Sequence, residues 1–272
     1  MALPVLTGIA THESLYDAYV EQILVTGGTG QLGSAVVAAL RAAGEQVRVL
    51  SRRRAPEYAT GDLRTGRGID TAVAGADVIV HCATDFLRET EFAHRLIEAA
   101  RWAGAEHLVY VSIVGVDRIP LGYYRAKHET EQLIAASGLP CTILRATQFH
   151  ALVRTLFAGA SRLPVVPVPK MRFQPVDVRD VASRLATLAA GDPVGRADDF
   201  GGPEVLDAAD LASAVSAATG RKRRILPVRL PGALFRGFAD GGNLTPEHAN
   251  GKITFAGYLA EQPDAGRLRY RG

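Results

Sequence analysis

Four glycines stand close together near the beginning of the chain, within the stretch QILVTGGTGQLG at residues 22–33. The apolar run ILV before them is typical of a buried strand, and the run SAVVAALRAA after them has helical spacing and ends at Gly44. Small residues at such a strand-to-helix turn let a pyrophosphate approach the backbone, while the helix presents free N–H groups and the positive end of its dipole. The stretch predicts a dinucleotide phosphate site, with a ligand-free glycine turn as the alternative. The expected contacts are Gly27, Thr29, Gly30, Gln31, Leu32 and Gly33.

A tyrosine and a lysine four residues apart, Tyr123 and Lys127, would lie on one face of a helix. An ammonium near a phenol favours the phenolate and lowers the pKa of the tyrosine. Such a tyrosine can donate a proton to a carbonyl oxygen while hydride arrives at the carbon. Tyr124 competes for this role, and packing or a hydrogen bond at a helix start is the alternative for both tyrosines.

Predicted strands and helices alternate around these residues. Beyond the first strand, apolar runs predict strands over residues 46–50, 78–82, 106–113 and 140–145, and helical spacing predicts helices over residues 89–103 and 122–137. This alternation predicts an α/β fold, a Rossmann-type doubly wound parallel sheet with a small C-terminal substrate lobe. We expect a leader over residues 1–20 with a short helix near 14–20, a core over 21–160, and a substrate-side lobe over 161–272 interleaved with the core.

The second predicted strand ends in Ser51, Arg52, Arg53 and Arg54, with no acidic residue. An acidic side chain at this place would accept the hydroxyls of the adenosine ribose and repel a 2′-phosphate. A serine hydroxyl can donate a hydrogen bond, and a guanidinium fits a phosphate with two hydrogen bonds. Ser51, Arg52 and Arg53 therefore predict NADP(H) as the cofactor in preference to NAD(H), with a solvated basic loop as the alternative.

Further cofactor contacts are expected where other strands end, because ligands bind at the carboxyl ends of parallel strands. Asp62 and Leu63 are expected near the adenine. His150 could face the substrate, although a lone histidine is more often structural. The proline-rich residues 163–173 could form the rim of the substrate pocket. The remaining expected contacts are Cys82, Ala83 and Thr84 beside the cofactor, and Ala146, Thr147 and Phe149 bordering the nicotinamide.

Several of these segments, GGTGQLG, VIVHCAT, VSIVGVD, YYRAKHETEQLI and ILRATQFH, resemble the short-chain dehydrogenase/reductase superfamily. The resemblance is greatest to its atypical NmrA-like branch, which includes NADPH-dependent quinone and azo-dye reductases and cofactor-sensing regulators. FQPVDVRDVA and FGGPEVLDAADLASAVSAATGRK resemble later segments of the same family.

The resemblance implies that Tyr123 and Lys127 work with a serine on the preceding strand, here Ser112, and that Lys127 also binds the nicotinamide ribose. It implies an NADPH-dependent reductase that passes hydride to a small quinone-like or conjugated carbonyl acceptor. Two alternatives stay open: a regulatory protein that senses NADP(H) without turnover, and a sugar-nucleotide epimerase or dehydratase. The doubled tyrosine and the short interval between Ser112 and Tyr123 depart from the ordinary pattern of the superfamily.

Composition sets limits on the partners. The chain has 272 residues and a net charge of +3, with basic runs only at residues 52–54 and 221–224, so no general nucleic-acid surface is expected. Cys82 and Cys141 lie in apolar runs and have no metal-ligand spacing, which fits buried thiols in a reducing compartment. No apolar stretch has membrane-spanning length. We expect a cytoplasmic protein, monomeric or homodimeric, that acts on a small molecule and binds neither nucleic acid nor a membrane.

Overall fold

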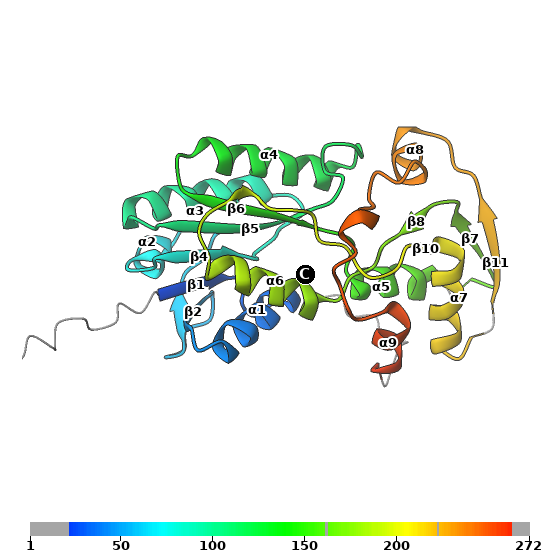
Figure 1. Cartoon of the computed structure of the whole chain (residues 1–272), viewed down its shortest axis with the longest axis horizontal. Coiled ribbons are helices and arrows are strands. Elements are labelled where there is room, and N and C mark those ends of the chain that lie inside the picture. Colours follow the sequence, from blue (N-terminus) through cyan, green and yellow to red (C-terminus); the bar gives the residue numbers. More distant parts are fainter. Residues whose placement is uncertain (1–21, 161–162, 222, 263–272) are drawn as a thin grey trace, which may run out of the picture.

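Seven parallel strands form the main sheet of the computed structural model, which describes residues 22–160, 163–221 and 223–262. The spatial order is β3-β2-β1-β4-β5-β6-β9, so the chain winds outward from β1 first to one side and then to the other (Figure 1). The expected Rossmann-type α/β fold is confirmed. The strands are β1 (Gln22–Thr26), β2 (Gln46–Ser51), β3 (Tyr58–Thr60), β4 (Val78–His81), β5 (His107–Ile113), β6 (Cys141–Ala146) and β9 (Gly195–Arg196).

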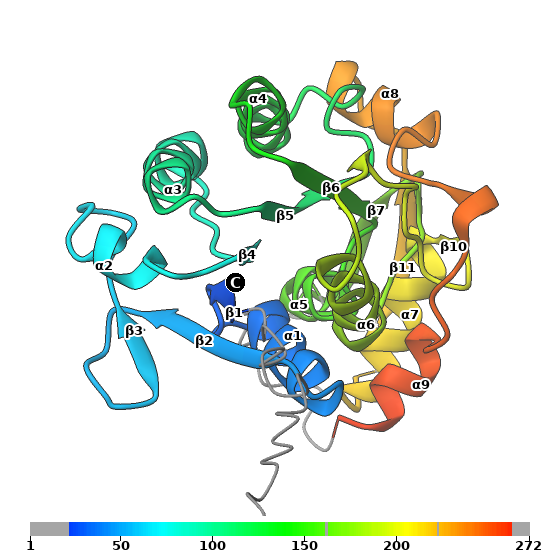
Figure 2. The same ribbon diagram turned by 60° about the vertical axis from the view of Figure 1, so that its left-hand side comes forward.

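Helices cover both faces of this sheet because the strand side chains alternate between two apolar layers. Ile23 and Val25 of β1 pack with α1 and α6 on one face, whereas Leu24 packs with α2 and α3 on the other. Figure 2 shows the sheet edge-on between the two helical layers. The helices are α1 (Gln31–Ala42), α2 (Ile69–Val73), α3 (Glu89–Ala103), α4 (Gly122–Ala136) and α6 (Val178–Ala189).

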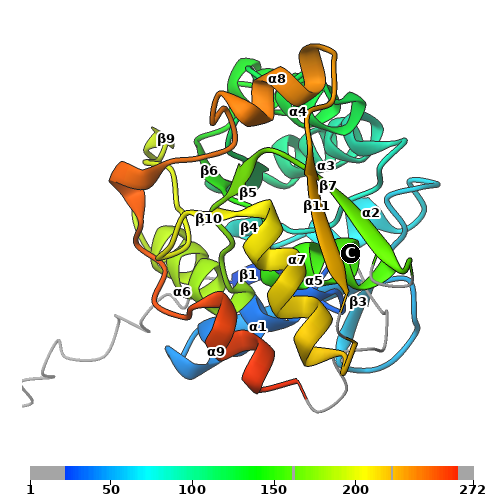
Figure 3. The ribbon, with the colours of Figure 1, turned by 90° about the vertical axis from the view of Figure 1, so that its right-hand side faces the viewer.

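A smaller lobe lies beside the carboxyl edge of the sheet (Figures 1 and 3). The chain enters it after β6, returns to the sheet with α6 and β9, and then enters it again. Its own apolar core includes Phe157, Phe173, Leu211 and Tyr258. The lobe contains α5 (His150–Ala160), β7 (Val165–Pro169), β8 (Arg172–Phe173), β10 (Leu206–Asp207), α7 (Ala208–Ala218), β11 (Arg224–Val228), α8 (Ala233–Ala239), the 3-10 helix Pro246–His248 and α9 (Phe255–Ala260).

Some expectations from the sequence differ from this arrangement. The proline-rich residues 163–173, for which no strand was expected, contain β7, which pairs in parallel with β11, and β8, which pairs with β10. Helix α5 and strand β3 were not expected. The leader over residues 1–20 lies outside the described residues. In the part of the chain that the structure describes, no helix has the length and apolar character needed to cross a membrane.

Candidate functional site

The glycine turn lies at the point where the strand order reverses, between β1 and β4, which is where such sheets bind ligands. Gly27 has φ +65°, and a Cβ atom there would lie 2.6 Å from the backbone nitrogen of Ala83. A Cβ atom on Gly33 would lie 2.2 Å from the carbonyl oxygen of Gly27. The first turn of α1, the end of β1 and the end of β4 are therefore so close together that only glycine fits at both positions.

The beginning of α1 presents backbone donors toward this edge. Gly30 is the N-cap residue, and no side chain among the described residues caps the helix there. The first turn of α1 also contains no acidic side chain. Thr29 is exposed and Leu32 is buried in the core. The free N–H groups and the dipole of α1 fit an anionic pyrophosphate, which is the group the sequence predicts here.

The ends of β2 and β3 lie along the same edge. Ser51 is buried, and its hydroxyl accepts a hydrogen bond from the backbone N–H of Arg53 at 3.1 Å. The side chains of Arg52 and Arg53 are exposed to solvent. Asp62 accepts a hydrogen bond from the backbone N–H of Arg64 at 2.9 Å, and the neighbouring Leu63 is buried. This part of the edge thus combines two exposed guanidinium groups with a serine, and no carboxylate follows β2 directly in the sequence.

Lys127 of α4 lies in the interior beneath the end of β4, with only 4% of its surface exposed. Its Nζ is 2.7 Å from Oε1 of Glu89, the first residue of α3. The ammonium also donates a hydrogen bond to the carbonyl oxygen of Val111 at 3.1 Å, and it lies 4.6 Å from the ring centroid of Tyr110. The sequence singled out Lys127 but neither Glu89 nor Tyr110.

Tyr123 joins the same group of residues through Thr84. The Thr84 hydroxyl is 2.7 Å from the Tyr123 hydroxyl and donates a hydrogen bond of 2.7 Å to Oε2 of Glu89. The ring of Phe86, which is 61% exposed, lies 4.5 Å from the ring of Tyr123. The end of β4 is held by the backbone N–H of Ala83, which donates to the hydroxyl of Thr26 at 3.2 Å.

Charge compensation governs the protonation of this cluster. Burial alone would lower the pKa of the Lys127 ammonium, but Tyr110, Glu89 and Tyr123 around it together outweigh this effect and hold that pKa well above its ordinary value. Burial would likewise raise the pKa of the Glu89 carboxyl, and Lys127 holds it below its ordinary value. Both groups are charged at neutral pH, so the site contains a buried ion pair.

The other two candidate groups lie apart from this pair. Tyr124 is buried among Val116, Ile119 and Phe238, and burial raises the pKa of its phenol to about 12. Ser112 is buried beside Glu131 of α4. Burial would raise the pKa of the Glu131 carboxyl, but the hydrogen bonds from Arg145 lower it. The structure thus brings Tyr123, not Tyr124, to Thr84, whereas the buried Ser112 hydroxyl has no hydrogen-bond partner among the described residues.

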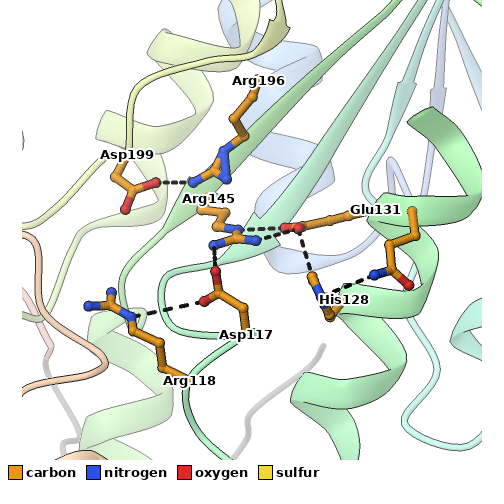
Figure 4. Close-up of polar contacts among 8 residues, drawn as sticks. Asp117, Arg118, His128, Glu131, Arg145, Arg196 and Asp199 are labelled. Carbon is orange, nitrogen blue, oxygen red and sulfur yellow. Dashed lines mark hydrogen bonds and ion pairs between the residues drawn. The ribbon is translucent and has the colours of Figure 1, made fainter.

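A second polar cluster supports the loop that leads into α4 (Figure 4). Arg145 of β6 forms two hydrogen bonds with Glu131, at 2.8 and 2.6 Å, and a third with Asp117 at 2.9 Å. Asp117 belongs to the connection between β5 and α4. The guanidinium therefore fixes both ends of the segment that carries Tyr123 and Lys127.

The residues after β6 are mostly engaged within the protein. Ala146 is buried and Phe149 is half-buried against the core. The Thr147 hydroxyl donates to the carbonyl oxygen of Gln174 at 2.5 Å. His150 is 1% exposed, and its Nε2 lies 3.0 Å from the carbonyl oxygen of Ile253 in the lobe. This placement gives no support to the expectation that His150 faces a substrate.

The fold and the glycine turn define a nucleotide-binding Rossmann protein, and comparison with known proteins identifies the family to which it belongs. The profile described as NAD(P)H-binding matches residues 27–189. The chain belongs to this family, which confirms the resemblance to atypical short-chain dehydrogenases/reductases.

Curated relatives agree with this membership. The chain is 30% identical over 223 residues to an NAD(P)H azoreductase of Xenophilus azovorans, covering 76% of this chain and 77% of the relative. It is 28% identical over 246 residues to a ceramide reductase of Caulobacter vibrioides, covering 79% of this chain and 76% of the relative.

Solved structures share the fold. An Escherichia coli NADPH-dependent quinone oxidoreductase in complex with NADPH superposes with a TM-score of 0.76 at 19% identity, covering 88% of this chain and 98% of that one. A triphenylmethane reductase of Citrobacter sp. in complex with NADP(H) gives a TM-score of 0.72 at 18% identity, covering 89% of this chain and 100% of that one.

Proposed function

We propose that this protein is an NADPH-dependent oxidoreductase that transfers hydride to a small quinone-like or conjugated carbonyl acceptor. The observation that carries the proposal is the position of Tyr123, which contacts Thr84, and of Lys127, which pairs with Glu89, beside the strand end that touches the glycine turn. A cofactor held by that turn would have its reactive end beside these side chains. The azoreductase, ceramide reductase and quinone oxidoreductase among the similar proteins support the same reaction class.

NADPH, when bound, supplies the hydride. The glycine turn and the beginning of α1 would hold its pyrophosphate, and Arg52 and Arg53 would bind the 2′-phosphate together with Ser51. Lys127 would donate a hydrogen bond to the nicotinamide ribose. Charge-assisted hydrogen bonds to a phosphate contribute roughly 1.5–3 kcal/mol each, so NADPH should bind at least about tenfold more tightly than NADH.

The acceptor would enter beside Phe86. An exposed phenyl ring packed on the Tyr123 ring offers an apolar surface that suits a planar, conjugated molecule. The Tyr123 hydroxyl already has a partner in Thr84. An acceptor whose reduced anion is stable, such as a quinone, therefore suits this site better than a simple ketone, which needs a proton donor.

Incubation of the purified protein with NADPH or NADH and a panel of quinones, azo dyes and enones tests the proposal. We expect NADPH oxidation with at least one quinone or azo dye, and tighter calorimetric binding of NADPH than of NADH. Absence of NADPH binding would refute the proposal. Tight binding without oxidation of any acceptor would instead support a cofactor-sensing regulator, and turnover of a sugar nucleotide would support an epimerase or dehydratase.

We further propose a cytoplasmic enzyme that acts on a small molecule as a monomer or homodimer, without nucleic acid or a membrane as partner. The mild net charge of +3 and the scattered basic residues support this part of the proposal. Light scattering during size-exclusion chromatography, with and without NADPH, measures the oligomeric state.

A further inference from the structure

Glu89 is enclosed on every side although it begins a helix. Its side chain is 0% exposed, and two donors meet each carboxylate oxygen. Oε1 receives Lys127 Nζ at 2.7 Å and the Tyr110 hydroxyl at 2.9 Å. Oε2 receives the Thr84 hydroxyl at 2.7 Å and the backbone N–H of Asp85 at 3.1 Å. These donors come from α4, from β5 and from the β4–α3 connection, so this carboxylate joins three separate elements.

The carboxylate also sets the direction of the hydrogen bond made by Tyr123. A carboxylate can only accept, and Thr84 has a single hydroxyl proton, which it donates to Glu89. At the 2.7 Å contact between the Thr84 and Tyr123 hydroxyls, Tyr123 must therefore be the donor. Glu89 thus controls a hydroxyl that it does not touch.

We propose that Glu89 is a positioning residue of the cofactor site, acting through Lys127 and Thr84 and not by contact with the cofactor. It holds the Lys127 ammonium at the place where the ribose would bind, and it holds the Tyr123 hydroxyl toward Thr84. The inference rests on the proposed function, because it takes Lys127 as the residue that binds the ribose.

The other titratable groups around Lys127 cannot replace the charge of Glu89. Burial lowers the pKa of His81 to about 4 and raises the pKa of Cys82 to about 12, so both are neutral near pH 7. Burial also raises the pKa of Tyr110. Removal of the Glu89 charge would leave the buried ammonium uncompensated and lower its pKa. The groups that face this ammonium from β4, β5, α3 and α4 are His81, Cys82, Glu89, Tyr110 and Tyr123.

The test is the pH dependence of NADPH binding to Glu89→Gln, which keeps the shape of the side chain but removes its charge. The cofactor phosphate titrates in the same way in both measurements, so its contribution cancels in the ratio of the variant dissociation constant to the wild-type one. We expect this ratio to rise about tenfold between about pH 6 and about pH 9, as Lys127 loses its proton in the variant but not in the wild type. A ratio that stays constant across this range would refute the proposal, even if the variant binds weakly throughout.

Unfolding by urea without cofactor gives a second, independent readout. An uncompensated lysine has a lower pKa in the folded protein than in the unfolded chain, where it is about 10.4. Such a lysine destabilises the fold most at a pH low enough for it to stay protonated in both states. The stability deficit of Glu89→Gln should therefore shrink as the pH rises from about 7 toward 10, while cofactor binding weakens. A loss of packing alone would produce neither trend, and a deficit that is independent of pH would contradict the proposal.

A double variant and a control keep the test decisive. Glu89→Gln with Lys127→Met removes both charges, and we expect it to fold and to bind NADPH weakly with a constant ratio. If Glu89→Gln fails to fold, this double variant decides: we expect it to regain folding because the uncompensated ammonium is gone, and a double variant that also fails to fold would refute the proposal. Glu91→Gln removes a partly exposed carboxylate of the same helix, paired with Arg95 at 2.6 Å, and should match the wild type. Failure of the wild type itself to bind NADPH would refute the proposed function, whereas the urea experiment would still test the ion pair.

Discussion

Substitution of Gly33 by alanine should destabilise the fold, because the added methyl group meets only backbone. Its carbon would lie 2.2 Å from the carbonyl oxygen of Gly27, 2.6 Å from the carbonyl carbon of Gly27 and 2.8 Å from the Cα atom of Gly28. Non-bonded heavy atoms rest about 3.5 Å apart, so α1 would have to move away from the end of β1 by about 1 Å. No flexible side chain can absorb this movement.

The expected magnitude follows from overpacking. Forcing extra carbon into a packed interior costs about 1–3 kcal/mol, and the upper part of this range applies where backbone must shift. We expect Gly33→Ala to lower the free energy of unfolding by about 3 kcal/mol, which corresponds to a fall in Tm of roughly 6–12 °C for a chain of this size. NADPH binding should weaken as well, since the displaced helix would no longer present its N–H groups to the phosphates.

Gly30→Val is the matched variant that separates ligand from fold. Gly30 has φ −82° and ψ 178°, an extended conformation that valine adopts without strain. Valine at the N-cap should change the free energy of unfolding by about 1 kcal/mol or less. Its branched side chain would occupy the space of the pyrophosphate, so we expect the NADPH dissociation constant to rise by about a hundredfold or more.

Urea unfolding followed by circular dichroism, and NADPH titration by calorimetry, should be performed on both variants in the same buffer. A Gly33→Ala protein as stable as the wild type would refute the close packing of α1 on β1. Normal NADPH binding by Gly30→Val would show that the glycine turn is not the phosphate site. Loss of binding in Gly30→Val together with a large loss of stability would mean that the turn itself is damaged, and would leave the role of Gly30 structural.

Three further predictions concern the cofactor, the acceptor and pH. Arg52→Asp combined with Arg53→Asp should remove the preference for NADPH over NADH, measured by calorimetry, because carboxylates repel the 2′-phosphate; an unchanged preference would exclude these arginines. Tyr123→Phe should leave NADPH affinity nearly unchanged and slow quinone reduction only slightly, whereas a loss of about a hundredfold, with Tyr124→Phe harmless, would identify Tyr123 as an essential proton donor. Burial lowers the pKa of His81 to about 4, so between pH 6.5 and 4 the unfolded chain takes up a proton that the folded chain does not. Stability is therefore full above about pH 6.5 and falls by about 3 kcal/mol toward pH 4 in urea unfolding, and His81→Asn should show a smaller fall.

The five longest strands of the main sheet could be predicted from the sequence because their signals are local, whereas the short β3 and β9 were not expected. Helix α3 begins and ends where the sequence predicts, since its apolar period is regular and Gly104 ends it with φ +71°. Strand β7 could not be predicted, because prolines at 164, 167 and 169 indicate a loop. Prolines are tolerated in β7 because it is an edge strand whose one partner in its two-stranded sheet is β11.

The polar part of the candidate site was harder to predict than the glycine turn. The glycines are constrained by backbone close to them in the chain, whereas Glu89 gains its role only from Lys127, 38 positions away. A glutamate in the first turn of a helix is expected from the dipole alone, so its type gave no signal. One signal was available: if the lysine is buried, it needs a nearby negative charge, and Asp85 and Glu89 are the acids that follow β4 most closely.

His150 is a residue whose position in the sequence suggested a role for which its buried side chain gives no support. It follows β6 on the ligand side of the sheet, as expected, but its ring turns into the lobe. There it lies 5.5 Å from the ring of Phe255 and 5.2 Å from that of Tyr258, both in α9. The direction of a side chain at a strand end depends on partners more than 100 positions later in the chain, which no local pattern contains.

The Tyr123 hydroxyl connects the geometry of the site with the choice of acceptor. Because Thr84 donates its only proton to Glu89, Tyr123 donates to Thr84, and its own proton is already engaged in that hydrogen bond. Delivery of that proton to a substrate oxygen would require either a break in this hydrogen bond or a neutral Glu89, and Lys127 keeps the pKa of that carboxyl low. Reduction of a simple ketone with Tyr123 as the proton donor would therefore require the hydrogen bonds between Tyr123, Thr84 and Glu89 to change. Reduction of a quinone, whose product anion takes a proton from water, leaves the arrangement intact.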